Sequence, residues 1–234
     1  VNFVGTRHLT DCVLPLMGPG AAIVSIASTG GLGWSRRIPV HMELLQTRGF
    51  QAAVDWAEAH MDQVAEGYAC SKEAVIVWTQ FMGAQLIKQG IRINCSLPSP
   101  TQTPMMAAFH ATSGKDVVDA AAEPLGRYTT PTEQAGPLVL ICSDAASVVN
   151  GVVLPVDGGF MGGLATGQID LAAMMRLDDL DVPVIAEAAG GLAHQMGQQC
   201  HAERGIAGLQ HGDAFGGGIA QPVVALFQPG GADD

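Results

Sequence analysis

The sequence predicts an α/β protein in which about three parallel strands are covered by helices on both faces. Residues 21–26 form a short, continuous apolar run that is typical of a strand buried in a parallel sheet, and residues 91–97 and 152–156 are predicted to be the next two strands. Longer stretches between them repeat apolar residues at three-to-four spacing, which is typical of helices. This alternation of strand and helix patterns favours a parallel sheet.

The composition is that of a globular chain. The 234 residues, of which 48% are hydrophobic and 14% charged, suit one ordinary domain with an appendage. No apolar run reaches the length of a membrane span, and the first residues lack the order of a signal peptide. The five cysteines form no C-x-x-C pair and are interpreted as reduced thiols, mostly in the core. We therefore expect a cytoplasmic protein, and the net charge of -11 argues against a nucleic-acid partner.

A helix and a strand are the first elements predicted. Residues 3–17 carry a helical apolar stripe, which the Gly-Pro-Gly at 18–20 ends. The strand at 21–26 then runs into the small-residue loop at 27–31. Because ligands bind at the carboxyl ends of strands in open α/β sheets, Ser28 in this loop is a candidate site residue.

The segment from about residue 35 to 67 is mostly helical in pattern. It contains a short helix around Leu44 and a second one from about Phe50 to Met61. No obvious chemistry lies in it. We interpret it as a packing or subunit-contact arm, and a substrate lid is the alternative.

Tyr68 and Lys72 begin the next helix, which runs to about Lys88 and is capped by Gly90. Residues four apart lie on one face of a helix. A lysine ammonium one turn away favours the phenolate and lowers the tyrosine pKa from its usual value near 10. The pair is therefore a plausible proton-transfer unit, although a helix with a surface tyrosine and lysine gives the same pattern.

The remaining ordered elements follow in turn. The strand at 91–97 ends at Pro98 and leads into an irregular loop at 98–104, after which a helical region at 105–122 is placed to close over a site. A proline in the first turn and an early acid start a helix at Thr130 that runs to Ser143. The last strand, at 152–156, ends in Asp157-Gly158-Gly159.

The end of the chain differs in character. From Asp178 onward there are eight acidic residues against one basic residue, together with glycine clusters and little periodicity. We expect this tail to be poorly ordered, with residues 223–227 either a strand or an apolar island. A frame-shifted read-through is a further hypothesis. No metal site is predicted, because the spacing of His194, Cys200, His201 and His211 matches none.

Four of these features, in this order, resemble the short-chain dehydrogenase/reductase family. They are the strand ending in Ser28, the Tyr68/Lys72 helix, the strand Arg92-Ile93-Asn94-Cys95 running into Pro98…Thr103-Pro104, and Val156-Asp157-Gly158-Gly159. Val1-Asn2-Phe3-Val4-Gly5 matches the V-N-x-x-G of the family's fourth helix. The resemblance covers residues 1–160. The long insertion before Tyr68 and the run at 72–78 are similar to the coniferyl-alcohol dehydrogenase and 3α-hydroxysteroid dehydrogenase group.

The resemblance implies roles for individual residues. Tyr68 is the expected acid/base, and Lys72 is expected to lower its pKa and to hold the nicotinamide ribose. Ser28 is expected to hydrogen-bond the substrate oxygen and to steady the developing charge. Asn2 is expected to hold a water in the proton relay to Lys72, with capping of the first helix as the alternative.

The implied cofactor is NAD or NADP, with NAD slightly favoured. The expected cofactor-binding residues are Tyr68, Lys72, Pro98, Ser99, Thr101 and Thr103, with Thr103 near the carboxamide. Ser99 departs from the family pattern, which usually has glycine after the proline. A glycine there allows close backbone approach and positive φ, so the serine is expected to strain the turn or to shift the nicotinamide.

A larger departure is that the family's first half is missing from the sequence. There is no T-G-x-x-x-G-x-G loop to bind the pyrophosphate, no ribose selector and no N-N-A-G. Because Val1 is not methionine, we expect a fragment or a start codon read literally. The sequence thus predicts the C-terminal half of a Rossmann-type doubly wound sheet at 1–165 and a tail at 166–234. We expect an exposed edge on the strand at 21–26, marginal stability and weak NAD(P) binding.

The function implied is that of an NAD(P)-dependent oxidoreductase. It would interconvert an alcohol, aromatic allylic or hydroxysteroid-like, and its carbonyl compound, and its full-length form is expected to be a homo-oligomer. A non-catalytic remnant is the alternative. An epimerase or dehydratase of the same superfamily also uses Tyr-x-x-x-Lys, but the Val-Asp-Gly-Gly at 156–159 argues against it.

Overall fold

The computed structural model describes residues 2–64 and 67–170. Its main elements run in the predicted order: α1 (Val4–Val13), β1 (Ala22–Ile26), α5 (Gly67–Leu86), β2 (Arg92–Pro98), α8 (Pro131–Cys142) and β3 (Val153–Val156). Short 3-10 turns follow two of the helices, η1 (Leu14–Leu16) and η3 (Ile87–Gln89). The apolar run at 223–227, the tail histidines and nearly all of the predicted tail lie outside the described residues.

The three strands form one parallel sheet in the order β1-β2-β3. Ile23 lies opposite Ile93, and Cys95 lies opposite Val153, so β2 is the central strand. Among the described residues β1 pairs with β2 alone, and Ile26 at its end is 54% exposed. The predicted fold class, three parallel strands of a Rossmann-type sheet with flanking helices, is confirmed.

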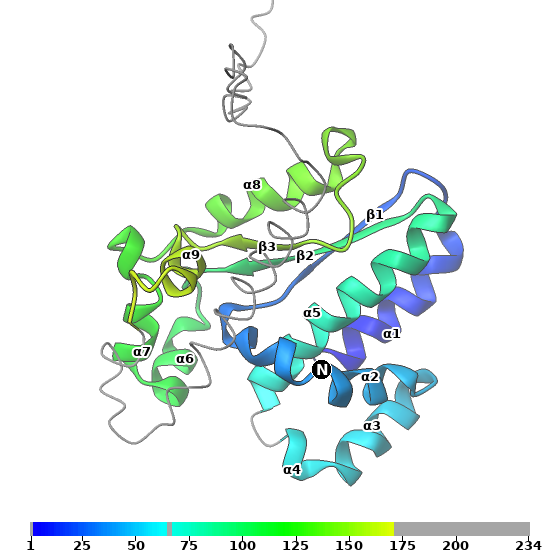
Figure 1. Cartoon of the computed structure of the whole chain (residues 1–234), viewed down its shortest axis with the longest axis horizontal. Coiled ribbons are helices and arrows are strands. Elements are labelled where there is room, and N and C mark those ends of the chain that lie inside the picture. The colour runs from blue at the N-terminus through cyan, green and yellow to red at the C-terminus, as the bar shows by residue number, and fades with distance from the viewer. Residues whose placement is uncertain (1, 65–66, 171–234) are drawn as a thin grey trace, which may run out of the picture. The chain divides into compact units, whose positions relative to one another are not determined.

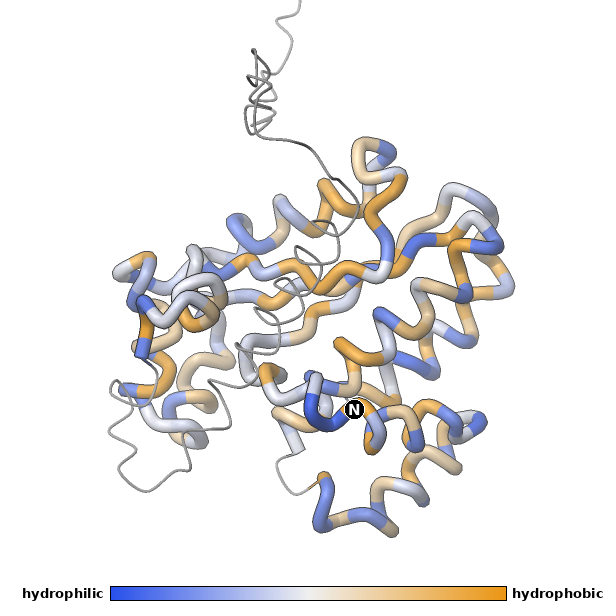
Figure 2. The backbone as a smooth tube through the Cα atoms, in the orientation of Figure 1, coloured by the Kyte–Doolittle hydropathy of each residue, from blue (hydrophilic) through white to orange (hydrophobic). Residues whose placement is uncertain are grey.

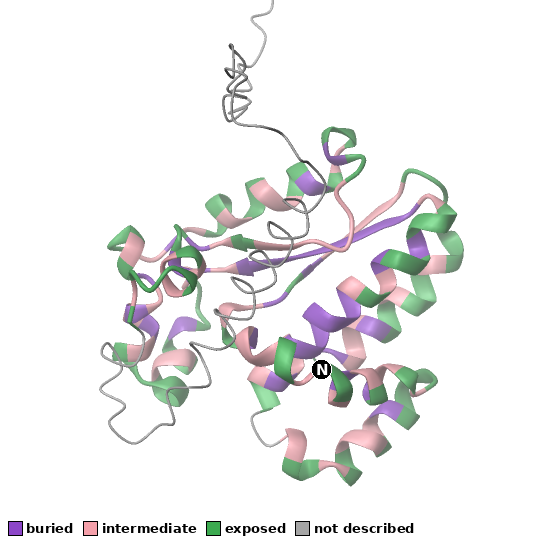
Figure 3. Ribbon diagram, in the orientation of Figure 1, coloured by how far each residue is buried: buried purple, intermediate pink, exposed green. Residues whose placement is uncertain are grey.

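Helices lie on both faces of the sheet (Figure 1). The helix α5 packs against one face and α8 against the other, while α1 lies beside α5. The core is built mainly from α5 and β2. Figure 3 shows β2 and the middle of α5 as buried, and Figure 2 shows hydrophobic residues along the strands. Its largest fully buried side chains include Ile76, Trp78, Leu86, Ile93 and Leu97. Residues 73–79 of α5 are all buried, so this part of the helix is enclosed on more than one side.

Arg92 on the central strand is buried although it is charged. Its guanidinium donates to the main-chain carbonyls of Ile141 (2.6 Å), Cys142 and Ser143 (both 3.1 Å), at the end of α8, and to that of Val149 (3.4 Å). The last carbonyls of a helix lack partners within it and form the negative end of its dipole. A buried cation therefore satisfies them and ties α8 to the sheet.

The segment before α5 folds as helices, as predicted. The helices α2 (Ile38–Gln46), α3 (Gly49–Ala59) and α4 (Met61–Val64) follow the 3-10 segment η2 (Thr29–Arg36). α2 packs against α5, and α3 packs against α1.

A buried arginine of α1 anchors this segment. Arg7 donates to the Leu44 carbonyl, the Thr47 hydroxyl and the Gly49 carbonyl, each at 3.1 Å, where α2 ends and α3 begins. These contacts support the interpretation of the segment as a packing arm.

The helical region predicted at 105–122 contains two helices, α6 (Met106–Ser113) and α7 (Lys115–Ala120), because Gly114 between them has φ +82 and interrupts the helix. The four cysteines that the structure describes are not mostly in the core, which corrects the prediction: Cys70 and Cys95 are buried, but Cys12 and Cys142 are exposed.

In the part of the chain that the structure describes, no helix is both long and apolar enough to cross a bilayer.

Candidate active site

Tyr68 and Lys72 lie in the first two turns of α5. The Lys72 Nζ lies 5.6 Å from the centroid of the Tyr68 ring, within the range of a cation–π contact. It also donates to the Ile26 carbonyl at 2.8 Å, which holds the lysine at the carboxyl end of β1. Tyr68 is 39% exposed, so its ring can be reached from solvent. The predicted pairing of the two side chains on one helix face is confirmed.

Ser28 is brought to Tyr68 by the turn after β1. Its hydroxyl accepts a hydrogen bond from the Gly30 nitrogen (3.0 Å), which makes it the cap of η2 (Thr29–Arg36), and it also hydrogen-bonds the side chain of Tyr68. The two residues are forty positions apart in the sequence, so the sheet and α5 together create this contact.

Glycines allow η2 to lie directly on α5. A Cβ on Gly30 would lie 3.3 Å from the Tyr68 ring. A Cβ on Gly31 would lie 3.0 Å from the Ile76 side chain and 3.1 Å from the backbone of Lys72 and Glu73. Larger residues would push η2, and with it Ser28, away from Tyr68. The small-residue loop is therefore what lets the hydroxyl reach the tyrosine.

The pKa of Tyr68 departs from the expectation. Burial raises it above its usual value of 10.0, and the hydrogen bond to Ser28 acts in the opposite direction. Burial also lowers the pKa of Lys72, while Cys95 on β2 opposes that shift. The predicted direction of the net pKa shift of Tyr68 is therefore wrong, because burial of the phenol outweighs the hydrogen bond to Ser28.

Asn2 lies near the site but contacts a different residue from the one expected. Its side-chain amide donates to the Ser71 hydroxyl (3.3 Å), which in turn donates to the Tyr68 carbonyl (2.6 Å). The alternative role is not supported, because the N-cap of α1 is Phe3 and no side-chain capping hydrogen bond is formed there. Sequence reasoning missed Ser71, although it stands between the tyrosine and the lysine.

The predicted cofactor-binding residues in the loop after β2 differ in burial and in hydrogen bonding. Ser99 is buried, and its hydroxyl donates to the Thr129 hydroxyl at 3.3 Å. Thr101 donates to the Ser99 carbonyl at 2.8 Å, and its hydroxyl lies 3.1 Å from that of Thr129. Both side chains are thus engaged within the protein. Pro98 is partly buried, and Thr103 is exposed and open to a ligand.

Phe109 is a site residue that sequence reasoning missed. It lies on α6, and its ring meets the Tyr68 ring edge to face, with centroids 5.2 Å apart and planes at 75°. The following residue, His110, bonds the Tyr128 hydroxyl at 2.9 Å. The predicted closing of the 105–122 region over a site has support, since Phe109 on its first helix contacts Tyr68. An aromatic residue just after the Pro98–Pro104 loop was the available signal.

The turn after β3 is fixed by its own aspartate. Asp157 is buried, and its two carboxylate oxygens accept from the nitrogens of Gly159 and Met161, both at 2.9 Å. Gly159 has φ +99, which favours glycine. The carboxylate thereby starts the short helix α9 (Phe160–Ala165).

Together, the parallel sheet, the helices on both faces and a polar cluster at the carboxyl ends of the strands define a Rossmann-type α/β domain. Residues 49–161 match the family model described as enoyl-(acyl carrier protein) reductase. The chain belongs to the short-chain dehydrogenase/reductase family.

Three relatives illustrate this membership. The coniferyl-alcohol dehydrogenase of Pseudomonas sp. is 32% identical over 68% of this chain, and the 3-alpha-hydroxysteroid dehydrogenase/carbonyl reductase of Comamonas testosteroni is 28% identical over 68%. The chain spans 63% of the length of each. A crystal structure of 3-alpha-hydroxysteroid dehydrogenase from Pseudomonas sp. B-0831 complexed with NADH has a TM-score of 0.58 and 26% identity, covering 77% of this chain and 67% of that one.

Proposed function

We propose that the chain carries the proton-transfer half of an NAD(P)-dependent oxidoreductase that interconverts an alcohol and its carbonyl compound. The observation that carries the proposal is the contact of Tyr68 with both Ser28 and Lys72 at the carboxyl ends of the strands. A hydroxyl acid/base, a neutral hydrogen-bond donor and a cation within one small site suit proton transfer to a substrate oxygen.

Tyr68 is the proposed acid/base. In alcohol oxidation, Tyr68 takes the proton of the substrate hydroxyl while a hydride leaves the carbon that bears this hydroxyl. In carbonyl reduction, Tyr68 returns the proton to the substrate oxygen. The nicotinamide ring, when bound, supplies the acceptor or donor of that hydride. Ser28 donates to the substrate oxygen as charge develops on it. Lys72 keeps a positive charge beside the phenolate, which favours the ionised tyrosine.

Asn2 and Ser71 are proposed to complete the relay to Lys72. The Asn2 amide reaches Ser71 directly, one residue before the lysine. A water held by these two polar groups would pass a proton between Lys72 and solvent. The exposed position of Asn2 supports such an exchange.

The residues present fit the nicotinamide end of a dinucleotide. Lys72 is only partly buried, and Thr103 offers a free hydroxyl in the loop after β2. We propose that these two, with Tyr68 and the backbone of Pro98 and Ser99, contact the nicotinamide ribose and carboxamide, with NAD slightly favoured over NADP. Since no glycine-rich phosphate loop is in the sequence, the chain alone is expected to bind NAD(P) weakly.

The proposed substrates are aromatic allylic or hydroxysteroid-like alcohols. The names of the relatives motivate this class. The Phe109 ring beside Tyr68 supports it, because an apolar ring next to the acid/base suits a large apolar substrate.

A homo-oligomer is also proposed. Val139 and Leu140 on α8 and Val148 after it are all exposed apolar side chains, which supports contact with a second copy. Light scattering of the purified chain tests this, and a monomer at all concentrations would contradict it.

The test is turnover by the full 234-residue chain with coniferyl alcohol and NAD⁺ or NADP⁺, followed by absorbance of the reduced cofactor. Tyr68→Phe is expected to lower the rate by about 10²- to 10⁴-fold. Tyr128→Phe is the matched control, since Tyr128 is the second of the two tyrosines, and it should leave the rate unchanged. Unaltered turnover in Tyr68→Phe would refute the acid/base role. A cooperative melt with micromolar NADH affinity would contradict the predicted weak binding.

A further inference from the structure

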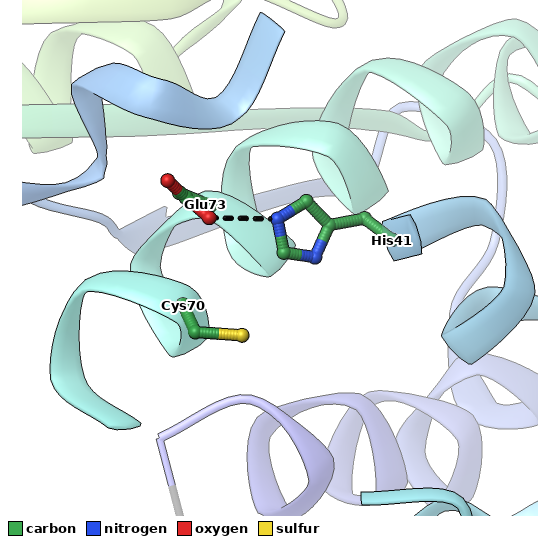
Figure 4. Close-up of side chains that lie close together, drawn as sticks. All are labelled: His41, Cys70 and Glu73. Carbon is green, nitrogen blue, oxygen red and sulfur yellow. Dashed lines mark hydrogen bonds and ion pairs between the residues drawn. The ribbon is translucent and has the colours of Figure 1, made fainter. Parts of the chain in front are cut away.

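Three buried or partly buried side chains meet beside α5. Glu73 accepts from the Arg37 guanidinium at 3.0 Å and, through the same oxygen, from the His41 Nε2 at 2.9 Å. Figure 4 shows the contact between His41 and Glu73. His41 and Glu73 are buried, and the other ring nitrogen of His41 has no hydrogen-bond partner among the described residues. Glu73 is therefore the one residue that the His41 ring bonds to there. We refer to Arg37, His41 and Glu73 as the Glu73 cluster.

The cluster contains groups that could ligate a metal, since donor atoms of His41, Cys70 and Glu73 lie within 4.8 Å of one another. Arg37, however, already contacts the Glu73 carboxylate and lies 3.9 Å from the Cys70 sulfur. A metal cation would have to sit beside this fixed positive charge, at a carboxylate whose charge is already neutralised. We therefore interpret the cluster as a buried ion pair with a histidine partner.

The position of the cluster relative to η2 suggests its role. Ser28 precedes η2 and Arg37 follows it directly. Ser28 contacts Tyr68, and Arg37 contacts Glu73, so both ends of the segment are bonded to the first turns of α5. Between them a Cβ on Gly33 would lie 2.5 Å from Oε1 of Glu73. The same carboxylate thus packs against the middle of the segment and binds its end.

Arg37 also ties the segment to the packing arm. Its second guanidinium nitrogen donates to the Gln63 carbonyl in α4, and the Arg37 carbonyl accepts from the His41 nitrogen at 3.0 Å in the first turn of α2. A single residue therefore connects η2, α2, α4 and α5. Only arginine offers a planar set of donors that can reach a carboxylate and a carbonyl at once.

We propose that the Glu73 cluster is a positioning clamp: it holds residues 28–37 on α5 so that the Ser28 hydroxyl stays in hydrogen-bond contact with Tyr68. The proposal rests on the proposed function insofar as Tyr68 is taken to be the acid/base. It gives the packing arm a second task, since Arg37 and His41 both come from its beginning.

The test follows the ionisation of Tyr68 directly and needs neither substrate nor cofactor. The sequence has two tyrosines, so in Tyr128→Phe protein the near-ultraviolet absorbance of tyrosinate reports Tyr68 alone. Arg37→Ala in this background should raise the titration midpoint by about one pH unit. Loss of the Ser28 hydrogen bond and an uncompensated Glu73 charge both oppose the phenolate. Arg37→Lys keeps the charge but not the two-sided contact, and should give a smaller shift in the same direction.

Two comparisons separate positioning from general stability. Arg127→Ala removes an exposed ion pair with Glu133 (3.0 Å and 2.6 Å) and should leave the Tyr68 titration unchanged. Ser28→Ala should raise the midpoint, and adding Arg37→Ala to it should raise it by less than Arg37→Ala does alone. A melting temperature lowered by Arg37→Ala with an unchanged titration would overturn the clamp, as would fully additive shifts. A chain without turnover would refute the proposed function and still permit this titration.

Discussion

Two segments approach Tyr68 from different sides, and they are held there by different forces. The segment η2 lies on α5 by contact of backbone on backbone, which Gly30 and Gly31 permit, and its end is tied down by a buried carboxylate. Helix α6 reaches the same tyrosine with a single ring edge, that of Phe109.

The support behind α6 is polar and largely at the surface. His110 bonds the Tyr128 hydroxyl, which also donates to Asp119 on α7, and Asp119 pairs with Lys115. Exposed pairs of this kind contribute little to stability, and water competes with each of them. The residues proposed for proton transfer are therefore held by close packing, whereas α6 depends on weaker contacts near the surface.

The largest effect is expected from disturbing the packed side. Gly31→Val should destabilise the protein by about 2 kcal/mol or more, because the added atoms meet the backbone of Lys72 and Glu73. Denaturant unfolding followed by circular dichroism measures this. Gly5→Ala in α1 is the control, since a Cβ there meets nothing within 4 Å, and it should not destabilise. Equal stability of Gly31→Val and wild type would show that η2 is not held on α5 by close packing.

The packed side should also set the pH dependence. The protonated form of Tyr68 is favoured because partial burial raises the pKa of the phenol, so the base form increases as pH rises from neutrality towards and beyond 10.0. Alcohol oxidation should therefore accelerate by up to about tenfold per pH unit, while carbonyl reduction should not. Initial rates in both directions across this range provide the measurement. An oxidation rate that levels off near neutral pH would show that bound cofactor lowers the pKa of Tyr68.

A smaller effect is expected on the adjustable side. Phe109→Ala removes one edge-to-face ring pair, worth about 0.5–1.5 kcal/mol, and should raise KM severalfold with little change in kcat. Phe109→Leu, which keeps an apolar side chain, is the control, and its KM should lie between those of wild type and Phe109→Ala. A loss confined to kcat would instead place Phe109 with the groups that position Tyr68.

The smallest effect is expected at the exposed ion pair of Lys115 and Asp119. Lys115→Ala breaks the exposed contact with Asp119 and should leave the melting temperature unchanged in physiological salt. Differential scanning fluorimetry of this variant beside Gly31→Val makes the contrast direct. A clear fall in melting temperature would mean that the polar support of α6 is as firm as the packing of η2.

Local patterns were sufficient for much of the fold. The positions of the three strands along the chain follow from local patterns, and the start of α8 follows from Thr130, whose hydroxyl and Glu133 form a capping box. The spacing of Tyr68 and Lys72 placed them on one helix face. Each of these features depends on residues a few positions apart.

Features that depend on distant residues could not be predicted. The direction of the pKa shift of Tyr68 depends on burial, which only tertiary packing determines. The partner of Asn2 proved to be Ser71, and no local pattern connects Arg37 with Glu73, thirty-six positions away. Phe109 was hidden for the same reason, because its contact with Tyr68 requires the loop after β2 to turn back over α5.

Arg92 has a consequence for how the domain opens. Its guanidinium binds carbonyls of the last turn of α8 from the middle strand of the sheet, so the end of α8 cannot fray without leaving a buried cation unpaired. The amide hydrogens of β2 and of the second half of α8 should then exchange with deuterium at similar rates, as one cooperative unit. Slow hydrogen exchange in the second half of α8, matching that of β2, would be the expected result of the contacts that Arg92 makes.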